Sequence, residues 1–438
     1  MTDLIDTPST GSVAWLRSRF LGLRCVSLLG AISLVAIACA SPPAKVSPSN
    51  GEIDAVQAWR DFTNGLEEAG VEFLNDYPQP QSIDRAEGLR YMLQQIQSAA
   101  LETLIRQPGE IPLLRNGPTT INKWGMDGAD GKYMNVAIDS SGTYRFRGQL
   151  GTARLFAVQL ATVIREYEAF DEITGDQIEM DSNGIFEILI SRERPKDWGG
   201  NWLELDPGAT DLIVREYFRD WETERPGTYW LERLDEVPPT QPVTANETAA
   251  LLAETVDQFK HRVPQYEPRL EKIRRFLVNK VVTRTGNDDN GTLAANAYGS
   301  GWFDVGPDEA LVIEVDPPSA RMWSVQLGNV WWESIDYLTH MTSYNDHQAR
   351  PSSDGLYRFV IAQRDPGVPN WLDPAGHREG MLFFRFQQSE SPATPKVELV
   401  SLGELTDHLP DDTPTVTSAE RRATLSKRQA HAARRWSP

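Results

Sequence analysis

Apolar residues recur along the first part of the chain at the spacing of α-helices. A first helix is predicted over residues 53–69, where apolar side chains fall three or four positions apart. Those side chains are Val56, Trp59, Phe62 and Leu66. A second helix is predicted over residues 82–105, and Pro108-Gly109 stops it. Both apolar stripes predict helices that pack one face into a core.

From about Thr119 the pattern changes to short runs rich in β-branched and aromatic residues. Turn signals such as residues 139–142 (DSSG) and 181–184 (DSNG) separate these runs. The runs are YMNVAID, TYRFRGQ, RLFAVQL, GIFEILIS, DLIVREYF and TYWLERL. This rhythm predicts the antiparallel strands of a β-sandwich or jelly roll.

A proline-rich segment, residues 238–242, reads as a linker to a second series of elements. Thr244 with Glu247 three positions later forms the signature of a helix capping box. Helices are therefore predicted over residues 247–262 and 267–282. A second β region follows over residues 297–402, with the runs ALVIEVDP, RMWSVQLGNV, LYRFVIAQ, MLFFRFQ and KVELVSL.

The order of helices, strands, helices and strands predicts a mostly β protein of the α+β class. It contains two antiparallel domains that resemble a β-sandwich or jelly roll. The expected division of the chain is a leader at 1–40, a tether and N-terminal helices at 41–118, a first sandwich at 119–237, a linker and helical segment at 238–296, a C-terminal sandwich at 297–405, and a basic disordered tail at 406–438.

The N-terminus has the features of an export signal. Arg17, Arg19 and Arg24 precede an uncharged run over residues 25–38, which is short for a membrane span and typical of a signal-peptide core. The run ends in Ala-Ile-Ala before Cys39, the arrangement that lipoprotein processing needs. We therefore expect lipidation of Cys39 and a membrane-anchored position on the outer face of a bacterial cell membrane. Simple secretion, or an uncleaved anchor, is the alternative.

Charge and cysteine content narrow the chemistry further. The formal net charge is −19, which argues against nucleic acid as the main partner because an acidic body repels phosphate backbones. Only Cys25 and Cys39 are present, both in the leader. The body of the protein therefore has no internal disulfide, no cysteine-ligated zinc and no thiol nucleophile. No cofactor is expected.

Three strings in the second β region carry a family resemblance. They are Trp323-Ser324-Val325-Gln326-Leu327, Tyr344-Asn345-Asp346-His347-Gln348 and Pro369-Asn370-Trp371-Leu372-Asp373. With these strings in this order, residues 297–402 resemble the domain-of-unknown-function family numbered 1214. The region from Lys123 to Trp221 looks more loosely like the companion family numbered 1254. The resemblance implies β-sandwich or jelly-roll domains with flanking helices, and it implies no established reaction.

Two aromatic and polar clusters in the C-terminal half are candidate binding residues. Sugars pack their C–H faces on indole rings and pair their hydroxyls with amide, imidazole and guanidinium groups. The candidate binding residues are Trp331, Trp332, Tyr344, Asn345, Asn370, Trp371, His377 and Arg378. The alternative is that tryptophan merely fills sandwich cores. A third cluster, Trp198 to Trp202, lies in the first β region.

Acid–base catalysis would need carboxylates or an imidazole at a set separation, which a sequence does not give. The candidates are His347, Asp373 and Asp346. A metal site at His340 and His347 with Asp336 or Asp346 is a further alternative, although the spacing matches no compact motif. No G-x-S-x-G motif or Walker lysine loop is present.

These observations lead to one function hypothesis and two alternatives. The hypothesis is a cell-envelope lipoprotein or secreted protein that binds a glycan or another polar envelope component, with processing of that ligand left open. The first alternative is a structural or assembly protein of the envelope without enzymatic activity. The second is a hydrolase that acts on a small ester or sulfate, for which the sequence contains no supporting motif.

Overall fold

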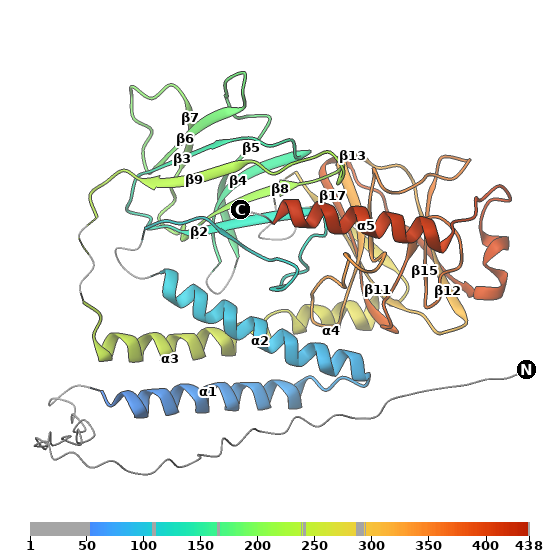
Figure 1. Cartoon of the computed structure of the whole chain (residues 1–438), viewed down its shortest axis with the longest axis horizontal. Helices are drawn as coiled ribbons and strands as arrows, with labels where there is room; N and C mark the ends of the chain where they lie inside the picture. The colour runs from blue at the N-terminus through green and yellow to red at the C-terminus, as the bar shows by residue number, and fades with distance from the viewer. Residues whose placement is uncertain are drawn as a thin grey trace, which may run out of the picture. The chain divides into compact units, whose positions relative to one another are not determined.

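The computed structural model describes residues 53–436, except 107–110, 164–166, 238, 240–241, 286–292 and 294. The expected leader, with Cys39, lies outside the described residues. Asn50–Pro438 form one compact unit, built from two β-sandwiches and a group of helices (Figure 1). The α+β class with two sandwich-like domains is confirmed. No helix among the described residues is long and apolar enough to cross a membrane.

The first sandwich consists of two sheets that enclose one apolar core. Its five-stranded sheet has the order β1-β2-β8-β4-β5, and its four-stranded sheet has the order β7-β6-β3-β9. All neighbours are antiparallel except β6 and β7, which are parallel. The strands are β1 (Arg115–Asn116), β2 (Gly131–Ala137), β3 (Tyr144–Gln149), β4 (Leu155–Thr162), β5 (Glu168–Thr174), β6 (Ile185–Ser191), β7 (Asn201–Glu204), β8 (Asp211–Tyr217) and β9 (Thr228–Arg233).

The second sandwich repeats this plan with the sheets β10-β11-β17-β13-β14 and β16-β15-β12-β18. Here β15 and β16 are the parallel pair. The strands are β10 (Val281–Thr285), β11 (Ala297–Asp304), β12 (Glu309–Val315), β13 (Ser319–Gly328), β14 (Ser343–Asn345), β15 (Tyr357–Ala362), β16 (Trp371–Leu372), β17 (Glu379–Ser391) and β18 (Lys396–Ser401).

Two of the four predicted helices begin and end close to their predicted limits, but the first continues to Asp76, beyond its predicted end at residue 69, and the fourth ends early. The described helices are α1 (Ala55–Asp76), α2 (Ser82–Ile105), α3 (Ala245–Arg262), α4 (Glu267–Phe276), α5 (Ser418–Arg435) and the 3₁₀ helix η2 (Leu402–His408). The capping box of α3 forms between Thr244 and Glu247. The prediction that α4 continues to residue 282 is wrong. Asn279 adopts a left-handed φ of 50°, and Val281 then pairs with Gly301 of β11.

The apolar stripes of α1 and α2 are only partly buried. Phe73 of α1 and Tyr91 of α2 join a cluster with Trp331 beside the second sandwich. Val56, Trp59, Leu89 and Leu93 are each more than half exposed. The expectation that these stripes pack wholly into a core is therefore corrected, because only part of each helix contacts its neighbours.

The predicted disordered tail is instead an ordered helix, α5. Thr417 and Glu420 form a capping box at its start. Arg421, Arg428 and Arg435 recur every seven residues and are all buried. Arg428 donates to the backbone oxygen of Ser343 in the second sandwich, and Arg435 donates to the carbonyl of Gly131 in the first. These three arginines thus face the protein, and α5 runs from one sandwich to the other (Figure 1).

The two sandwiches pack through the outer faces of their five-stranded sheets. Leu155 and Tyr217 of the first sandwich share an apolar cluster with Met322 of the second. The side chain of Gln326 on β13 accepts a hydrogen bond from Ala129 N and donates one to Asp127 O. Strand β8 is consequently buried along its whole length, on both faces.

Candidate functional site

The residues proposed as catalytic do not come together. His347 Nε2 lies 3.8 Å from Asp220 Oδ1, and Asp346 Oδ2 accepts a 2.6 Å hydrogen bond from Arg219 Nε. Both side chains therefore face the segment that follows β8 in the first sandwich. Asp373 instead pairs with Nδ1 of His340 at 2.8 Å. The expected grouping of His347, Asp346 and Asp373 is corrected, because Asp373 has a different histidine partner.

Four of the proposed binding residues are buried and contact other parts of the fold. Trp331 Nε1 donates to the backbone oxygen of Asp84 at 2.8 Å. Asn345 Nδ2 donates to Asp130 Oδ1 at 2.7 Å, and Asn370 Nδ2 donates to the backbone of the 343–350 segment at 2.8 Å. Tyr344 is buried beneath Arg428 of α5. The fold thus covers all four side chains, and ligand contact by Trp331, Tyr344, Asn345 and Asn370 stays a prediction.

The other four proposed binding residues lie in four different places. Trp371 donates its Nε1 to Ala362 O and stacks under Arg421, so α5 partly covers it. Arg378 is exposed and pairs with Asp304. Trp332 and His377 each line a cavity. The sequence hypothesis placed these four side chains in one site, and the structure separates them.

Trp332 lines a cavity of about 300 Å³ between the outer faces of the two five-stranded sheets. We call it the arginine cavity. Its aromatic lining comes from both sandwiches, the N-cap residue of α4 and the loop before β2, and includes Trp124, Tyr133, Tyr217, Tyr266 and Phe383. Gln265 and Arg269, which are exposed, also line it and mark the side that faces solvent.

Strand alternation brings two arginines into this cavity. On β8, Leu212 and Val214 point into the core of the first sandwich, so Arg215 lies on the opposite face. On β17, Leu382 and Phe384 belong to the core of the second sandwich, so Arg385 lies opposite them. Both arginines line the cavity.

Neutral groups hold both guanidinium groups. Arg215 donates to Gln159 Oε1 at 2.6 Å and to the hydroxyl of Tyr167 at 2.5 Å. Arg385 donates to Gln326 Oε1 at 2.8 Å and to the backbone oxygen of Met126. Both arginines are 7% exposed.

Across the described ranges of the chain, neither guanidinium forms an ion pair with a carboxylate. The two acidic residues of the lining are engaged elsewhere. Asp127 accepts from the backbone N and the hydroxyl of Ser334, and Glu102 pairs with Arg106. The arginine cavity therefore holds positive charge that the described protein does not neutralise.

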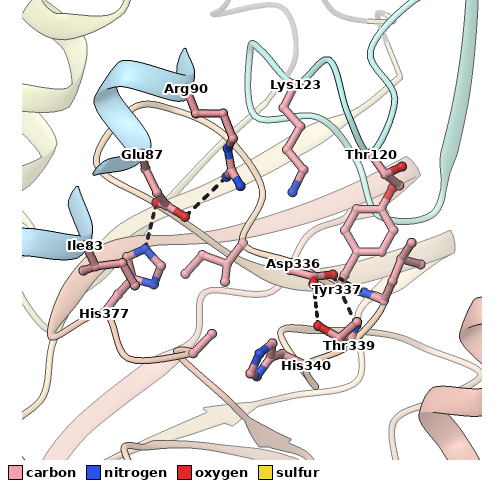
Figure 2. Close-up of a pocket in the computed structure, with 13 residues that line it drawn as sticks. Ile83, Glu87, Arg90, Thr120, Lys123, Asp336, Tyr337, Thr339, His340 and His377 are labelled. Carbon is pink, nitrogen blue, oxygen red and sulfur yellow. Dashed lines mark hydrogen bonds and ion pairs between the residues drawn. The ribbon is translucent and has the colours of Figure 1, made fainter. Parts of the chain in front are cut away.

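His377 lines a second cavity of about 400 Å³, which we call the histidine pocket (Figure 2). Figure 2 shows Glu87 between His377 and Arg90, with Lys123 pointing toward the same space. His377 Nε2 lies 2.8 Å from Glu87 Oε2, and Glu87 Oε1 lies 3.3 Å from Arg90 Nη2. His340 lies on the opposite side of the pocket, near Asp336.

Burial and neighbouring charges shift the pKa values of two carboxyl groups and one imidazole beside this pocket. Burial raises the pKa of Asp84 to about 6, although the neighbouring His377 opposes the shift. Burial by itself would raise the pKa of Glu87. The hydrogen bond and charge of His377 outweigh this effect, so the pKa of Glu87 lies below its usual value. Burial by itself would lower the pKa of His377, but the hydrogen bond and charge of Glu87 outweigh this effect, so the pKa of the imidazole is raised. Both shifts favour the charged form of the partner concerned, the imidazolium of His377 and the carboxylate of Glu87.

Sequence reasoning missed Arg215, Arg385, Asp84 and Glu87. A signal for Arg215 was present, because the run Asp211 to Phe218 (DLIVREYF) sets charged residues inside an otherwise apolar strand. A strand buried on both faces reads as a nearly continuous apolar run, so a charge inside one marks a buried polar group. No local signal joined Asp84 and Glu87 to His377, which lies 290 residues from Glu87.

Comparisons with known proteins support the fold and assign no activity. Residues 155–219 and 300–391 match the family described as protein of unknown function (DUF1214). This confirms the resemblance of the C-terminal half. It also extends the same family into the first sandwich. The resemblance to the family numbered 1254 is not shown. No curated protein matches the chain.

Two solved structures are similar to this chain. An uncharacterised protein from Burkholderia cenocepacia is 27% identical with a TM-score of 0.74, over 80% of this chain and 99% of that one. A protein from Vibrio parahaemolyticus is 13% identical with a TM-score of 0.41, over 72% of this chain and 98% of that one. The first of these supports the two-sandwich architecture.

Proposed function

We propose that this protein binds a small anion with an apolar body in the arginine cavity. The observation that carries the proposal is the pair of buried guanidinium groups, Arg215 and Arg385, which have no carboxylate partner in the described chain. A buried charge without a counter-charge costs several kcal/mol, even after the surroundings relax. A bound anion would remove this cost in the complex.

The chemistry of the lining suggests the class of anion. Guanidinium groups match the planar geometry of carboxylate and phosphate oxygens, and a charge-assisted hydrogen bond is about twice as strong as a neutral one. Tyr133, Tyr217 and Trp332 offer aromatic surface for an apolar part of the ligand. A volume of about 300 Å³ is at the lower end of the range for small-molecule sites. An amphipathic carboxylate or phosphate, or an acidic sugar, fits this description.

This proposal narrows the hypothesis of a glycan or other polar envelope component. A neutral sugar could stack on the aromatic rings but would leave the charges of Arg215 and Arg385 without a partner. An anionic ligand is therefore favoured over a neutral glycan. We further propose that the protein acts in the cell envelope, which rests on the leader.

A thermal-shift experiment with matched probes tests the binding proposal. Decanoate is compared with decanol, and glucuronate with glucose, so that each pair differs chiefly in charge. An anion at about a hundred times its dissociation constant should stabilise the fold by about 2.7 kcal/mol. We expect at least one anion to raise the unfolding temperature and its neutral partner to have no comparable effect. Equal stabilisation by the neutral partner, or none by either anion, would favour the assembly alternative.

Two variants connect the effect to the cavity. Arg215→Gln removes the buried charge but keeps an amide that can donate a hydrogen bond, so the shift with the anion should disappear. Arg60→Gln changes an exposed arginine on α1 outside the cavity and should retain the full shift. If Arg215→Gln responds to the anion as the wild type does, the ligand binds elsewhere and the proposal fails.

A further inference from the structure

Two carboxylates and one imidazole meet beside the histidine pocket. Asp84 and Glu87 lie three residues apart on the first turns of α2, and His377 comes from the loop between β16 and β17. One atom from each side chain can be chosen so that all three atoms lie within 4.8 Å of one another. We call these three residues the acid–histidine cluster. The arginine cavity does not contain any of them.

We propose that the acid–histidine cluster binds a divalent transition-metal ion, such as Zn²⁺ or Mn²⁺. The cluster has one nitrogen ligand and two carboxylate ligands. Imidazole suits zinc, iron and their neighbours, whereas calcium and magnesium prefer sites made only of oxygen. This inference is independent of the proposed function because the two sites share no residue.

The imidazole is oriented as a metal-binding histidine usually is. His377 Nδ1 lies 2.9 Å from the backbone oxygen of Pro374. A carbonyl oxygen can only accept a hydrogen bond, so Nδ1 carries the proton. This leaves Nε2 directed at the two carboxylates. A backbone carbonyl that fixes the tautomer in this way is the common outer partner of metal-bound histidine.

Asp84 supplies a second, independent observation that points to a ligand at the cluster. Its side chain is fully buried, and Oδ1 has no hydrogen-bond partner among the described residues. This oxygen lies 4.0 Å from His377 Nε2. Its other oxygen accepts a hydrogen bond from Gln81 at 3.0 Å, so the carboxylate is held in place. Buried carboxylate oxygens are rarely left without a partner, and a cation at the cluster would provide one.

The distances suit a metal ion after small movements. Metal–ligand bonds of about 2.0–2.2 Å at tetrahedral angles place two ligand atoms about 3.4 Å apart. The His377 Nε2 to Glu87 Oε2 distance is 2.8 Å, and the His377 Nε2 to Asp84 Oδ1 distance is 4.0 Å. Both differ from the tetrahedral value by about 0.6 Å. Asn329 Nδ2 also donates to Glu87 Oε2 at 2.9 Å, which orients this carboxylate.

The histidine pocket would leave room for further ligands. Glu87 and His377 both line it, together with Lys123, His340 and Thr120 (Figure 2). Sites with three protein ligands and one open position are typical of catalytic rather than structural zinc. Water or a polar substrate in the pocket could therefore complete the coordination of the metal.

Metal binding by the whole purified chain tests the inference. The protein is stripped with a chelator, dialysed against micromolar Zn²⁺ or Mn²⁺, and its metal content is measured by mass spectrometry. We expect about one equivalent of one of these metals to remain bound. Asp84→Asn preserves the shape of the side chain and should weaken binding by at least about 100-fold. Visible absorption of the Co²⁺ form should show the intense bands of a tetrahedral site.

A matched histidine pair provides the control. His377→Gln should lose the metal, whereas His340→Gln, which changes another histidine of the same pocket, should retain it. If His377→Gln does not fold, Asp84→Asn and His340→Gln still make the comparison. Absence of a retained metal, or equal metal content in Asp84→Asn and the wild type, would overturn the inference.

Discussion

At the scale of single residues, Gly88 and Trp331 determine how α2 packs against the second sandwich. Trp331 packs against Phe73 and Tyr91, and its indole nitrogen bonds to the backbone of α2. Gly88 allows this approach, because a Cβ added there would lie 2.6 Å from the indole ring. The same contact places Asp84 and Glu87 opposite His377.

Gly88→Ala should therefore destabilise the protein, although alanine normally favours a helix by about 0.5–1 kcal/mol over glycine. The clash with a buried ring should cost about 1–3 kcal/mol, which outweighs that gain. Gly70→Ala on α1 is the matched control, since its nearest neighbour would be Met92 Sδ at 3.8 Å. Urea denaturation should show a loss for the first variant and a gain for the second. A gain for both would contradict the close packing at Trp331.

At the scale of elements, α5 joins the two sandwiches through its arginines. Arg428 contacts the rings of Trp221 and Tyr344, and its guanidinium donates to Ser343 and Gln348. Trp221 belongs to the first sandwich region and Ser343 to the second. A helix with this role is structural, even though its composition alone is typical of a solvated basic tail.

Arg428→Ala should lower the free energy of unfolding by about 3 kcal/mol, because it removes a buried side chain and leaves its acceptors unpaired. Lys427→Ala changes the adjacent residue, whose ion pair with Glu222 lies on the surface. That control should change the free energy by less than about 1 kcal/mol. Chemical denaturation of both variants makes the measurement. If both variants change the free energy of unfolding by equally small amounts, α5 does not stabilise the fold and the prediction of a disordered tail is favoured again.

At the scale of the whole molecule, two sandwiches of similar plan form one compact unit with a charged cavity between them. The strands that supply Arg215 and Arg385 belong to different sandwiches, so the site requires both. The body that carries the site has no cysteine. The body therefore depends on packing rather than on disulfides for its stability.

The proposed export of the whole chain is testable at Cys39. In a bacterial host, labelled palmitate should enter the wild-type protein, which should fractionate with membranes. Cys39→Ser should lose both the label and the membrane association, because the thiol that accepts the lipid is gone. Cys25→Ser, which changes the other cysteine of the leader, should behave as the wild type. Label in the Cys39→Ser variant would contradict lipidation at that position.

The sequence by itself determined the local elements and the class of fold. The capping box at Thr244, the spacing of apolar residues in α2 and the alternation of the β runs are local signals, and local hydrogen bonding and side-chain direction suffice to produce them. Helix α4 ended early because pairing of Val281 with β11 overrode the helical pattern. The basic α5 was missed because its arginines find their partners in distant strands.

Only the tertiary structure decided the candidate sites. Trp331, Asn345 and Asn370 looked suited to bind a ligand, but the packing of other elements covers them. Arg215 and Arg385 became a pair because the outer faces of β8 and β17 meet across the sandwich interface. A sequence sets which residues share one face of a strand, but the faces that meet are chosen by the packing of the whole chain.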